Sequence, residues 1–268
     1  MTNIIKKILY TFVSLSLLTS FILSGCEKKE VVVDSSEKIG IIGAMDVEVT
    51  SLKEATKIKE IVNIADMEFF DGVLGDKNVV VVKCNMGKVN AGVCASILIN
   101  TFKCTKIINT GCAGSLDNKL DIGDVVVSID GVQHDFDTEP IGFLKGEIPY
   151  TGLYAFPADI NLRNVAVKSI KESYPDINVY EGRICSGDQF INKKEQKERI
   201  ISDFGGLCCE MEGAAILHVC YLYHTPCVVI RAISDKPDET SFVEYQVFEK
   251  EAAIRSAKIV KEMLRNLD

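Results

Sequence analysis

Short apolar runs alternate with longer segments of helical pattern through most of this chain, and this alternation strongly limits its fold. The apolar runs are continuous, which is typical of strands buried on both faces of a parallel sheet. Strands are predicted at 38–44, 79–84, 106–111, 124–132, 178–187, 206–210 and 226–234, and helices at 45–56, 88–102, 157–174, 193–203, 211–223 and 242–266. Pro157 would lie in the first turn of its helix, where proline costs least, after a loop-rich stretch from 133 to 156. We predict an α/β fold, a three-layer α/β/α sandwich around a mixed, largely parallel sheet.

The first residues follow a different pattern from this domain. Lys6 and Lys7 precede the apolar run "ILYTFVSLSLLTSFIL", and "LSGC" then ends at Cys26. This arrangement resembles the signal peptide and lipobox of bacterial lipoproteins, which implies cleavage before Cys26 and lipidation of its sulfur. We therefore predict a signal peptide at 1–25, a lipidated tether at 26–37 and the folded domain at 38–268. The chain would be anchored on the extracytoplasmic side of a bacterial membrane; an uncleaved anchor, or a cytoplasmic protein, is the alternative.

Charge and cysteine content exclude several classes of protein. The formal net charge is −8, and no basic stripe occurs, so nucleic acid is not an expected partner. Ten cysteines are present, and Cys26 is assigned to lipid. The remainder is an odd number with irregular spacing and no C-x-x-C pair, so we predict neither a disulfide framework nor a metal site. Most of these cysteines lie inside apolar runs, as small core residues do.

Carboxylates follow several of the predicted strands. They are Glu48, Asp188, the pair Glu210 and Glu212, and Asp235. In open α/β sheets, ligands bind beyond the carboxyl ends of the strands, so these acids are expected to converge on one edge. An apolar surrounding can separate carboxylate pKa values and suit them to acid–base chemistry. Taken singly, each acid is more often a solvated or capping residue, and the pattern alone indicates only an α/β enzyme.

Five ordered segments carry a resemblance to a known family. They are "IGIIGAMDVEV" (39–49), "INTGCAGSL" (108–116), "SGDQFIN" (186–192), "EMEGAAILHVC" (210–220) and "VVIRAISD" (228–235). They resemble methylthioadenosine/S-adenosylhomocysteine nucleosidases of the purine nucleoside phosphorylase/hydrolase superfamily, and the similarity covers residues 38 to 266. The resemblance implies a nucleoside phosphorylase-like sandwich, adenine thionucleosides as substrates, a homodimer, and no metal or organic cofactor.

The resemblance also assigns roles to single residues. Asp235 corresponds to the general acid that protonates adenine N7, and Glu48 to the residue that activates water. Glu212 corresponds to the ribose-binding glutamate, Met211 to the methionine that packs on the ribose, and Ser234 to the residue that orients the acid. Further substrate contacts are implied for Phe190 and Ile191 at the adenine, for Met45, Phe69 and Phe242 at the 5′-thioalkyl group, and for Cys112, Ala113 and Gly114 in "NTGCAG". Cys112 departs from the serine that is frequent in the family, which replaces a hydroxyl by a weaker thiol donor.

Three alternatives remain open from the sequence. A nucleoside phosphorylase would need a positive phosphate site, yet Asn109 stands where related phosphorylases carry an arginine, and Arg231 lies within a strand. A sibling hydrolase acting on 5′-deoxyadenosine, futalosine or AMP would share the same motifs. A surface-tethered binding lipoprotein or adhesin would keep the fold without turnover. The segment "HDFD" (134–137) resembles a family loop, and the sequence assigns it no catalytic role.

Overall fold

The computed structural model describes residues 37–236 and 241–267, with the side chains of 241–244 left undescribed. The strands are β1 (Lys38–Gly43), β2 (Lys57–Ile64), β3 (Met67–Leu74), β4 (Lys77–Lys83), β5 (Lys106–Ser115), β6 (Val125–Gln133), β7 (Ala155–Pro157), β8 (Val179–Ser186), β9 (Cys208–Glu210) and β10 (Cys227–Asp235). The helices are α2 (Asp46–Ala55), α3 (Lys88–Asn100), the 3-10 turn η2 (Glu139–Ile141), α4 (Ile160–Ser173), α5 (Lys194–Phe204), α6 (Gly213–Leu222) and α7 (Ser241–Asn266). The predicted signal peptide and nearly all of the tether, including Cys26, lie outside the described residues.

The strands form one mixed sheet with the order β10-β6-β8-β9-β5-β1-β4-β3-β2, and β7 pairs with β6. Strand β1 runs parallel to both β4 and β5, whereas β10 runs antiparallel to β6. Strand β10 also pairs with β5, so β5, β9, β8, β6 and β10 close into a ring. The predicted α/β fold is thus confirmed, and the closure brings the ends of strands distant in sequence to one place.

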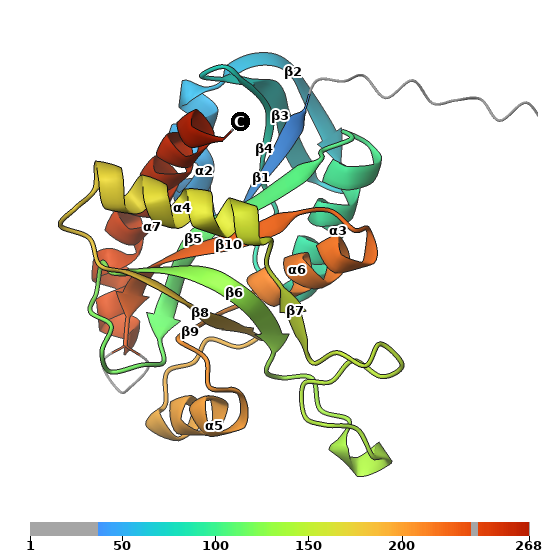
Figure 1. Cartoon of the computed structure of the whole chain (residues 1–268), viewed down its shortest axis with the longest axis vertical. Coiled ribbons are helices and arrows are strands. Elements are labelled where there is room, and N and C mark those ends of the chain that lie inside the picture. The colour runs from blue at the N-terminus through green and yellow to red at the C-terminus, as the bar shows by residue number, and fades with distance from the viewer. Residues whose placement is uncertain (1–36, 237–240, 268) are drawn as a thin grey trace, which may run out of the picture. The chain divides into compact units, whose positions relative to one another are not determined.

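Helices cover both faces of this sheet (Figure 1). Helices α2, α4 and α7 bury their apolar side chains against one face, in a cluster that includes Leu52, Ile170 and Val260. Helices α3 and α6 pack against each other and against the other face, with Cys94 and Leu217 in their cluster. Helix α5 has its own small cluster with the ends of β6, β8 and β9. Burial of these faces supplies the main driving force for the fold.

Two local predictions are wrong. The sequence predicts no strand between 57 and 74, where the structure has the antiparallel hairpin of β2 and β3. Strand β2 is mostly exposed, so its sequence lacks a continuous apolar run. Pro157 ends strand β7 instead of lying in a helix, and helix α4 begins later, capped by the Asp159 carboxylate, which accepts from the Leu162 N–H at 2.8 Å.

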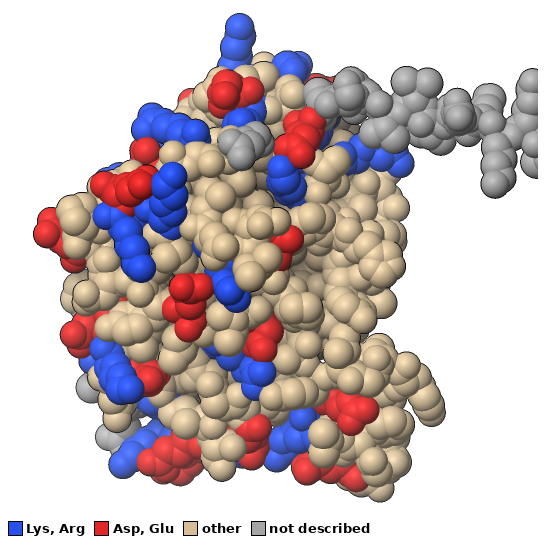
Figure 2. Space-filling view, in the orientation of Figure 1, with Lys and Arg blue, Asp and Glu red and all other residues tan. Residues whose placement is uncertain are grey.

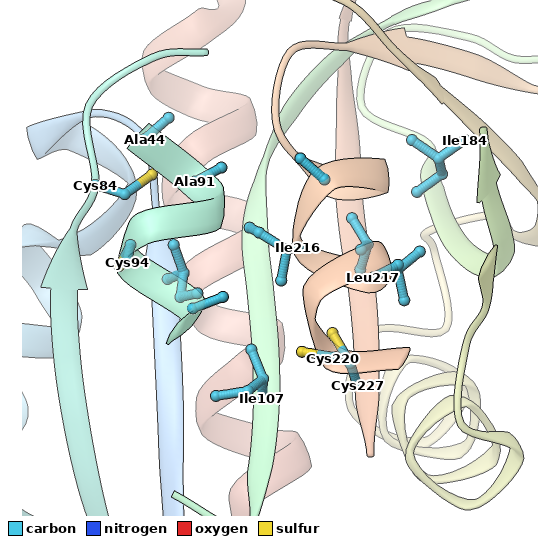
Figure 3. Close-up of a cluster of buried hydrophobic side chains, with 14 of the residues drawn as sticks. Ala44, Cys84, Ala91, Cys94, Ile107, Ile184, Ile216, Leu217, Cys220 and Cys227 are labelled. Atoms are coloured by element: carbon cyan, nitrogen blue, oxygen red, sulfur yellow. The ribbon is translucent and has the colours of Figure 1, made fainter. Parts of the chain in front are cut away.

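The cysteines of the described chain behave as core residues. All nine are free thiols, and every one except Cys112 is buried. Figure 3 shows Cys84, Cys94, Cys220 and Cys227 among apolar side chains between α3, α6 and the sheet. Burial raises the pKa of the Cys84 thiol above its ordinary value, which keeps it protonated and unreactive. Within 37–236 and 241–267, no helix is both long and apolar enough to cross a bilayer.

On the molecular face that Figure 2 shows, acidic and basic side chains lie next to one another on the left side, the top and the bottom, and much of the right side is uncharged. Surface ion pairs of the domain include Lys83 with Asp46 at 2.8 Å and Lys145 with Asp203 at 2.9 Å. This face presents no single-sign field of the kind that attracts phosphate backbones.

Candidate active site

The ends of β1, β5, β9 and β10 meet around a cavity that is partly open to solvent. The fold therefore brings most of the predicted site residues together. Those that line the cavity are Met45, Glu48, Cys112, Ala113, Gly114, Phe190, Ile191, Met211, Glu212, Ser234 and Asp235. Ala44, Met86, Gln189, Cys209, Glu210 and Tyr245 complete the wall.

Glu48 is a buried carboxylate in the first turn of α2, held by backbone donors from two segments. Its Oε2 accepts from the N–H groups of Ala44 at 2.6 Å and Met45 at 2.9 Å, and Oε1 accepts from the Cys112 N–H at 3.2 Å. Burial raises the pKa of Glu48, while Arg231 and these N–H groups oppose that rise. A Cβ on Gly111 would come within 2.5 Å of Oε1, so only glycine lets β5 pass this close to the carboxylate.

Arg231 lies beneath the cavity and connects the buried acids. It is 2 % exposed, and its Nη2 donates to a Glu210 carboxylate oxygen and to Asn109 Oδ1 at 2.6 Å. The second glutamate, Glu212, has its Oε2 4.0 Å from Nη2. One guanidinium thus balances a cluster of carboxylates that would otherwise be costly to bury.

Glu210 and Glu212 differ in what their oxygens contact. Glu210 accepts from the Ser186 hydroxyl and from the N–H groups of Glu212 at 3.1 Å and Gly213 at 2.8 Å, so it caps helix α6. Glu212 accepts at Oε1 from the Gly87 N–H at 2.9 Å, and it lines the cavity. Burial, with Glu210 adding to it, raises the pKa of Glu212 to about 8. Glu212 is therefore the acid of this pair with capacity left for a ligand.

Asp235 ends β10 and is 3 % exposed. Its Oδ1 accepts from the Ser234 hydroxyl at 2.7 Å, and that hydroxyl also lies 3.3 Å from the Ala113 carbonyl. The register between β10 and β5 shifts at Ile233 and Asp235, which turns the strand end toward the cavity wall. The Ser234 hydroxyl is thus in a position to orient the aspartate.

Aromatic and thioether side chains form the apolar part of the cavity. Phe190 is 42 % exposed and meets the Tyr245 ring edge-on, with centroids 5.4 Å apart. The Tyr245 hydroxyl lies 3.2 Å from the Met45 sulfur, so this tyrosine joins two walls. Ile191 is buried beside Phe190. An exposed ring at the edge of a cavity offers a surface on which a planar base can stack.

One predicted contact does not line the cavity, and another falls on a side chain outside the described residues. Phe69 lies on β3, is completely buried and stacks on Phe102 with ring centroids 4.9 Å apart. It belongs to the core beside α3 and is absent from the cavity wall, so its assignment to the 5′-thioalkyl pocket is wrong. The side chain of Phe242 lies outside the described residues. Among the described side chains of α7, Tyr245, one turn further along, is an aromatic residue that lines the cavity.

The sequence analysis missed Arg231, Tyr245 and Met86 as parts of the site. Arg231 was considered only as a phosphate ligand, although a charged residue inside an apolar strand is itself a signal of a buried ion-pair partner. Tyr245 and Met86 carry no such signal. Among the described residues, no group of three or more His, Cys, Asp or Glu side chains could hold a metal ion.

Comparison with known proteins agrees with this geometry. Residues 38–265 match the Phosphorylase superfamily. The 5′-methylthioadenosine/S-adenosylhomocysteine nucleosidase of Exiguobacterium sp. (strain ATCC BAA-1283 / AT1b) is 40 % identical over 233 residues, 86 % of this chain and 99 % of the relative. The Helicobacter pylori nucleosidase with butyl-thio-DADMe-Immucillin-A superimposes with a TM-score of 0.83 at 35 % identity, covering 87 % of this chain and 100 % of that one. The futalosine hydrolase of Helicobacter pylori strain 26695 has a TM-score of 0.82 at 35 % identity, covering 86 % and 98 %.

Fold, site and sequence match place the chain in the phosphorylase superfamily. Within that superfamily, it belongs to the 5′-methylthioadenosine/S-adenosylhomocysteine nucleosidases, which are N-glycosyl hydrolases.

Proposed function

We propose that this chain hydrolyses the N9–C1′ bond of 5′-methylthioadenosine and S-adenosylhomocysteine, releasing adenine and the 5-thioribose product. The observation that carries the proposal is the meeting of Glu48, Glu212 and Asp235 around one cavity that also holds Phe190. Three acids in different surroundings can take three different tasks in glycoside cleavage.

Departure of adenine leaves positive charge on the ribose ring, and each of the three acids assists a different part of that step. Asp235 delivers a proton to adenine N7, so that the base leaves as a neutral molecule. Glu48 accepts a proton from the water that attacks C1′. Glu212 accepts from the 2′- and 3′-hydroxyls, and its negative charge favours the developing cation. Met211 packs against the ribose, and Phe190 stacks on the base.

Water, in place of phosphate, is the nucleophile that this site favours. Arg231 is buried, and its guanidinium is already committed to Glu210 and Asn109. The cavity presents the Glu48 carboxylate instead of a free cation, and a carboxylate repels phosphate. Turnover in phosphate-free buffer separates the two reactions.

An adenine-release assay with purified protein lacking residues 1–25 tests the proposal. Wild type should release adenine from 5′-methylthioadenosine, and Asp235→Asn should lose nearly all of that activity, because an amide cannot deliver the proton. Replacement of Ser234 by Ala should reduce the rate less, since the acid remains. Binding of the nucleoside without release would instead support a binding lipoprotein or adhesin.

Futalosine is a second candidate substrate. The solved futalosine hydrolase of Helicobacter pylori superimposes on this chain as well as the nucleosidases do, with a TM-score of 0.82. The same three acids would serve, because the bond that breaks and the ribose are shared, and only the 5′ group and the base differ. Values of kcat/KM for futalosine, 5′-methylthioadenosine, S-adenosylhomocysteine and 5′-deoxyadenosine, measured side by side, rank the candidates.

We also propose that the chain forms a homodimer. Exposed apolar side chains gather on α3, its preceding loop and the end of α6, among them Met86 at 53 %, Val89 at 76 % and Leu222 at 58 %. Met86 lines the cavity as well, so a second copy seated here would close the site. Light scattering after size-exclusion chromatography should give twice the chain mass, and Val89→Asp should reduce it.

The lipobox leads to a further proposal, that Cys26 anchors the chain to the extracytoplasmic side of a bacterial membrane. Its support is the order of Lys6, Lys7, the apolar run and "LSGC", all of which precede the superfamily match at 38–265. In a bacterium that expresses the chain, a labelled fatty acid should be incorporated into wild type and not into Cys26→Ser. Label in both proteins would exclude Cys26 as the site.

A further inference from the structure

The segment "HDFD", to which the sequence gave no role, runs beside the loop that carries the base-stacking Phe190. Strands β6 and β8 are parallel neighbours and end at Gln133 and Ser186. The two segments that follow these strands remain adjacent, because the His134 N–H donates to the Ser186 carbonyl at 2.9 Å. The next contact is made by a side chain: Asp135 Oδ2 accepts from the Asp188 N–H at 2.9 Å.

Asp135 has a second partner on another element. Its Oδ1 accepts from the ammonium group of Lys88, the first residue of α3, and the two side chains are 15 % and 16 % exposed. Burial raises the pKa of Asp135, but Lys88 and the Asp188 N–H outweigh it, so the pKa lies below the ordinary value and the group is ionised at neutral pH. Asp135 thus bonds to two segments that are 100 residues apart in sequence.

These two segments are also tied directly to each other. The Lys88 N–H donates to Asp188 Oδ1 at 2.8 Å, which closes a ring of three residues. The preceding N–H, that of Gly87, donates to Glu212 Oε1 at 2.9 Å. Gly87 has a φ of 99°, a conformation that other residues rarely adopt, and a Cβ here would lie 3.2 Å from the Asp188 carboxylate. The same turn therefore touches the ribose-binding acid and the base-binding loop.

We propose that Asp135 is a positioning residue. It fixes the position of the adenine-stacking loop (187–191) relative to the Gly87–Lys88 turn and, through this turn, relative to Glu212. This inference rests on the proposed function, because it takes Phe190 as the contact to the base and Glu212 as the contact to the sugar. A rigid connection between the two contacts lets the base and the ribose bind together without a separate ordering cost for the loop. Asp135 itself does not line the cavity and acts through its neighbours.

The experiment measures kcat and KM for 5′-methylthioadenosine, and the inhibition constant of adenine, with the full-length chain. Loss of a charge-assisted hydrogen bond shifts an equilibrium by about tenfold or more. Asp135→Ala should therefore raise KM and the adenine inhibition constant about tenfold, with kcat within about threefold of wild type. Asp135→Asn, whose amide oxygen can still accept from the Asp188 N–H, should recover part of the loss. Lys88→Met should resemble Asp135→Asn, because it removes only the ion pair.

A double-mutant cycle with Phe190→Ala tests the route of the effect. If Asp135 acts through the loop, its replacement should change KM by no more than about twofold when the Phe190 ring is already absent. Asp71→Ala is the matched control, since Asp71 pairs with Lys38 at 2.6 Å, its side chain is 18 % exposed, and it does not line the cavity. This control should leave KM unchanged.

Several outcomes would overturn the inference. The inference fails if Asp135→Ala leaves KM and the adenine inhibition constant unchanged, or if it lowers kcat alone. It also fails if the effects of Asp135→Ala and Phe190→Ala on KM multiply fully in the double mutant. If Asp135→Ala does not fold, Asp135→Asn and Lys88→Met decide by the same criteria. If wild type releases no adenine from any nucleoside, the proposed function fails, and calorimetric adenine affinities of wild type and Asp135→Asn still decide the role of Asp135.

Discussion

The pKa of Glu212 predicts how the stability of this protein depends on pH. Burial and Glu210 raise that pKa from 4.5 to about 8, so between these values the folded chain holds a proton that the unfolded chain has lost. Stability falls with pH wherever the native state binds more protons. The contribution of Glu212 is therefore fully present below pH 4.5 and is lost as the pH rises through about 8.

The size of the effect follows from the same pKa. Each unit of pKa difference is worth about 1.4 kcal/mol, and the window spans about 3.5 units, so the loss amounts to at most about 5 kcal/mol. A small domain has about 5–15 kcal/mol of stability in total, so this effect is large enough to measure. Glu212→Gln is the matched variant, because its amide has nearly the same shape and does not titrate.

Urea unfolding at pH 5, 6, 7 and 8, followed by circular dichroism because the chain has no tryptophan, measures the effect. The free energy of unfolding of wild type should fall relative to that of Glu212→Gln by about 1.4 kcal/mol per pH unit. Titrating groups that do not interact with Glu212 cancel in this difference. A difference that stays constant from pH 5 to pH 8 would refute the reasoning.

Binding of substrate should reveal the same proton. Two ribose hydroxyls donate best to an ionised carboxylate, so binding at pH 7 should release close to one proton from Glu212. Calorimetry in buffers of different ionisation enthalpy measures this release with a 5′-methylthio C-nucleoside, whose carbon–carbon glycosidic bond resists hydrolysis. Adenine alone has no ribose and should release none from this group, and Glu212→Gln should abolish the difference between the two ligands.

The remaining predictions concern the core around the site. Arg231→Met should reduce the free energy of unfolding by about 3–5 kcal/mol in urea titrations, because it leaves Glu210 buried without its partner, and Arg231→Lys should lose less. Cys208→Ala and Cys209→Ala should each keep kcat/KM for 5′-methylthioadenosine within about threefold, since the proposed mechanism gives neither thiol a role; a tenfold loss would contradict this. Phe69→Ala should reduce the free energy of unfolding by about 3–5 kcal/mol and leave KM unchanged in the folded fraction. A raised KM would instead indicate that Phe69 contacts the substrate.

The stretch "CCEMEG" (208–213) shows how far residue types alone can mislead. Its paired cysteines suggest metal or redox chemistry, yet both are buried thiols on β9, and Cys209 only lines the back of the cavity. Burial raises the pKa of each thiol well above its ordinary value. The two acids that follow have different contacts: Glu210 accepts from the first N–H of α6, and Glu212 lines the cavity. The motif order pointed to Glu212, and the contacts of Glu210 came only from the structure.

The sequence by itself determined the α/β class, the order of most strands and helices, and the acids at the strand ends. It could do so because buried strands and helices impose their periodicity on the chain, and ligands gather where parallel strands end. It could not place strand β2, which is exposed and carries no apolar run, or Phe69, whose ring belongs to the core.

Tertiary structure alone decided how the acids differ from one another. Glu48, Glu210 and Glu212 are the same residue type, but backbone N–H groups hold the first, Arg231 and a helix terminus hold the second, and a single N–H from Gly87 reaches the third. The ring of Lys88, Asp135 and Asp188 likewise joins the start of α3 to two loops that no local pattern connects to it. Such contacts depend on distances between segments that lie far apart in the chain, and the closure of the sheet sets those distances.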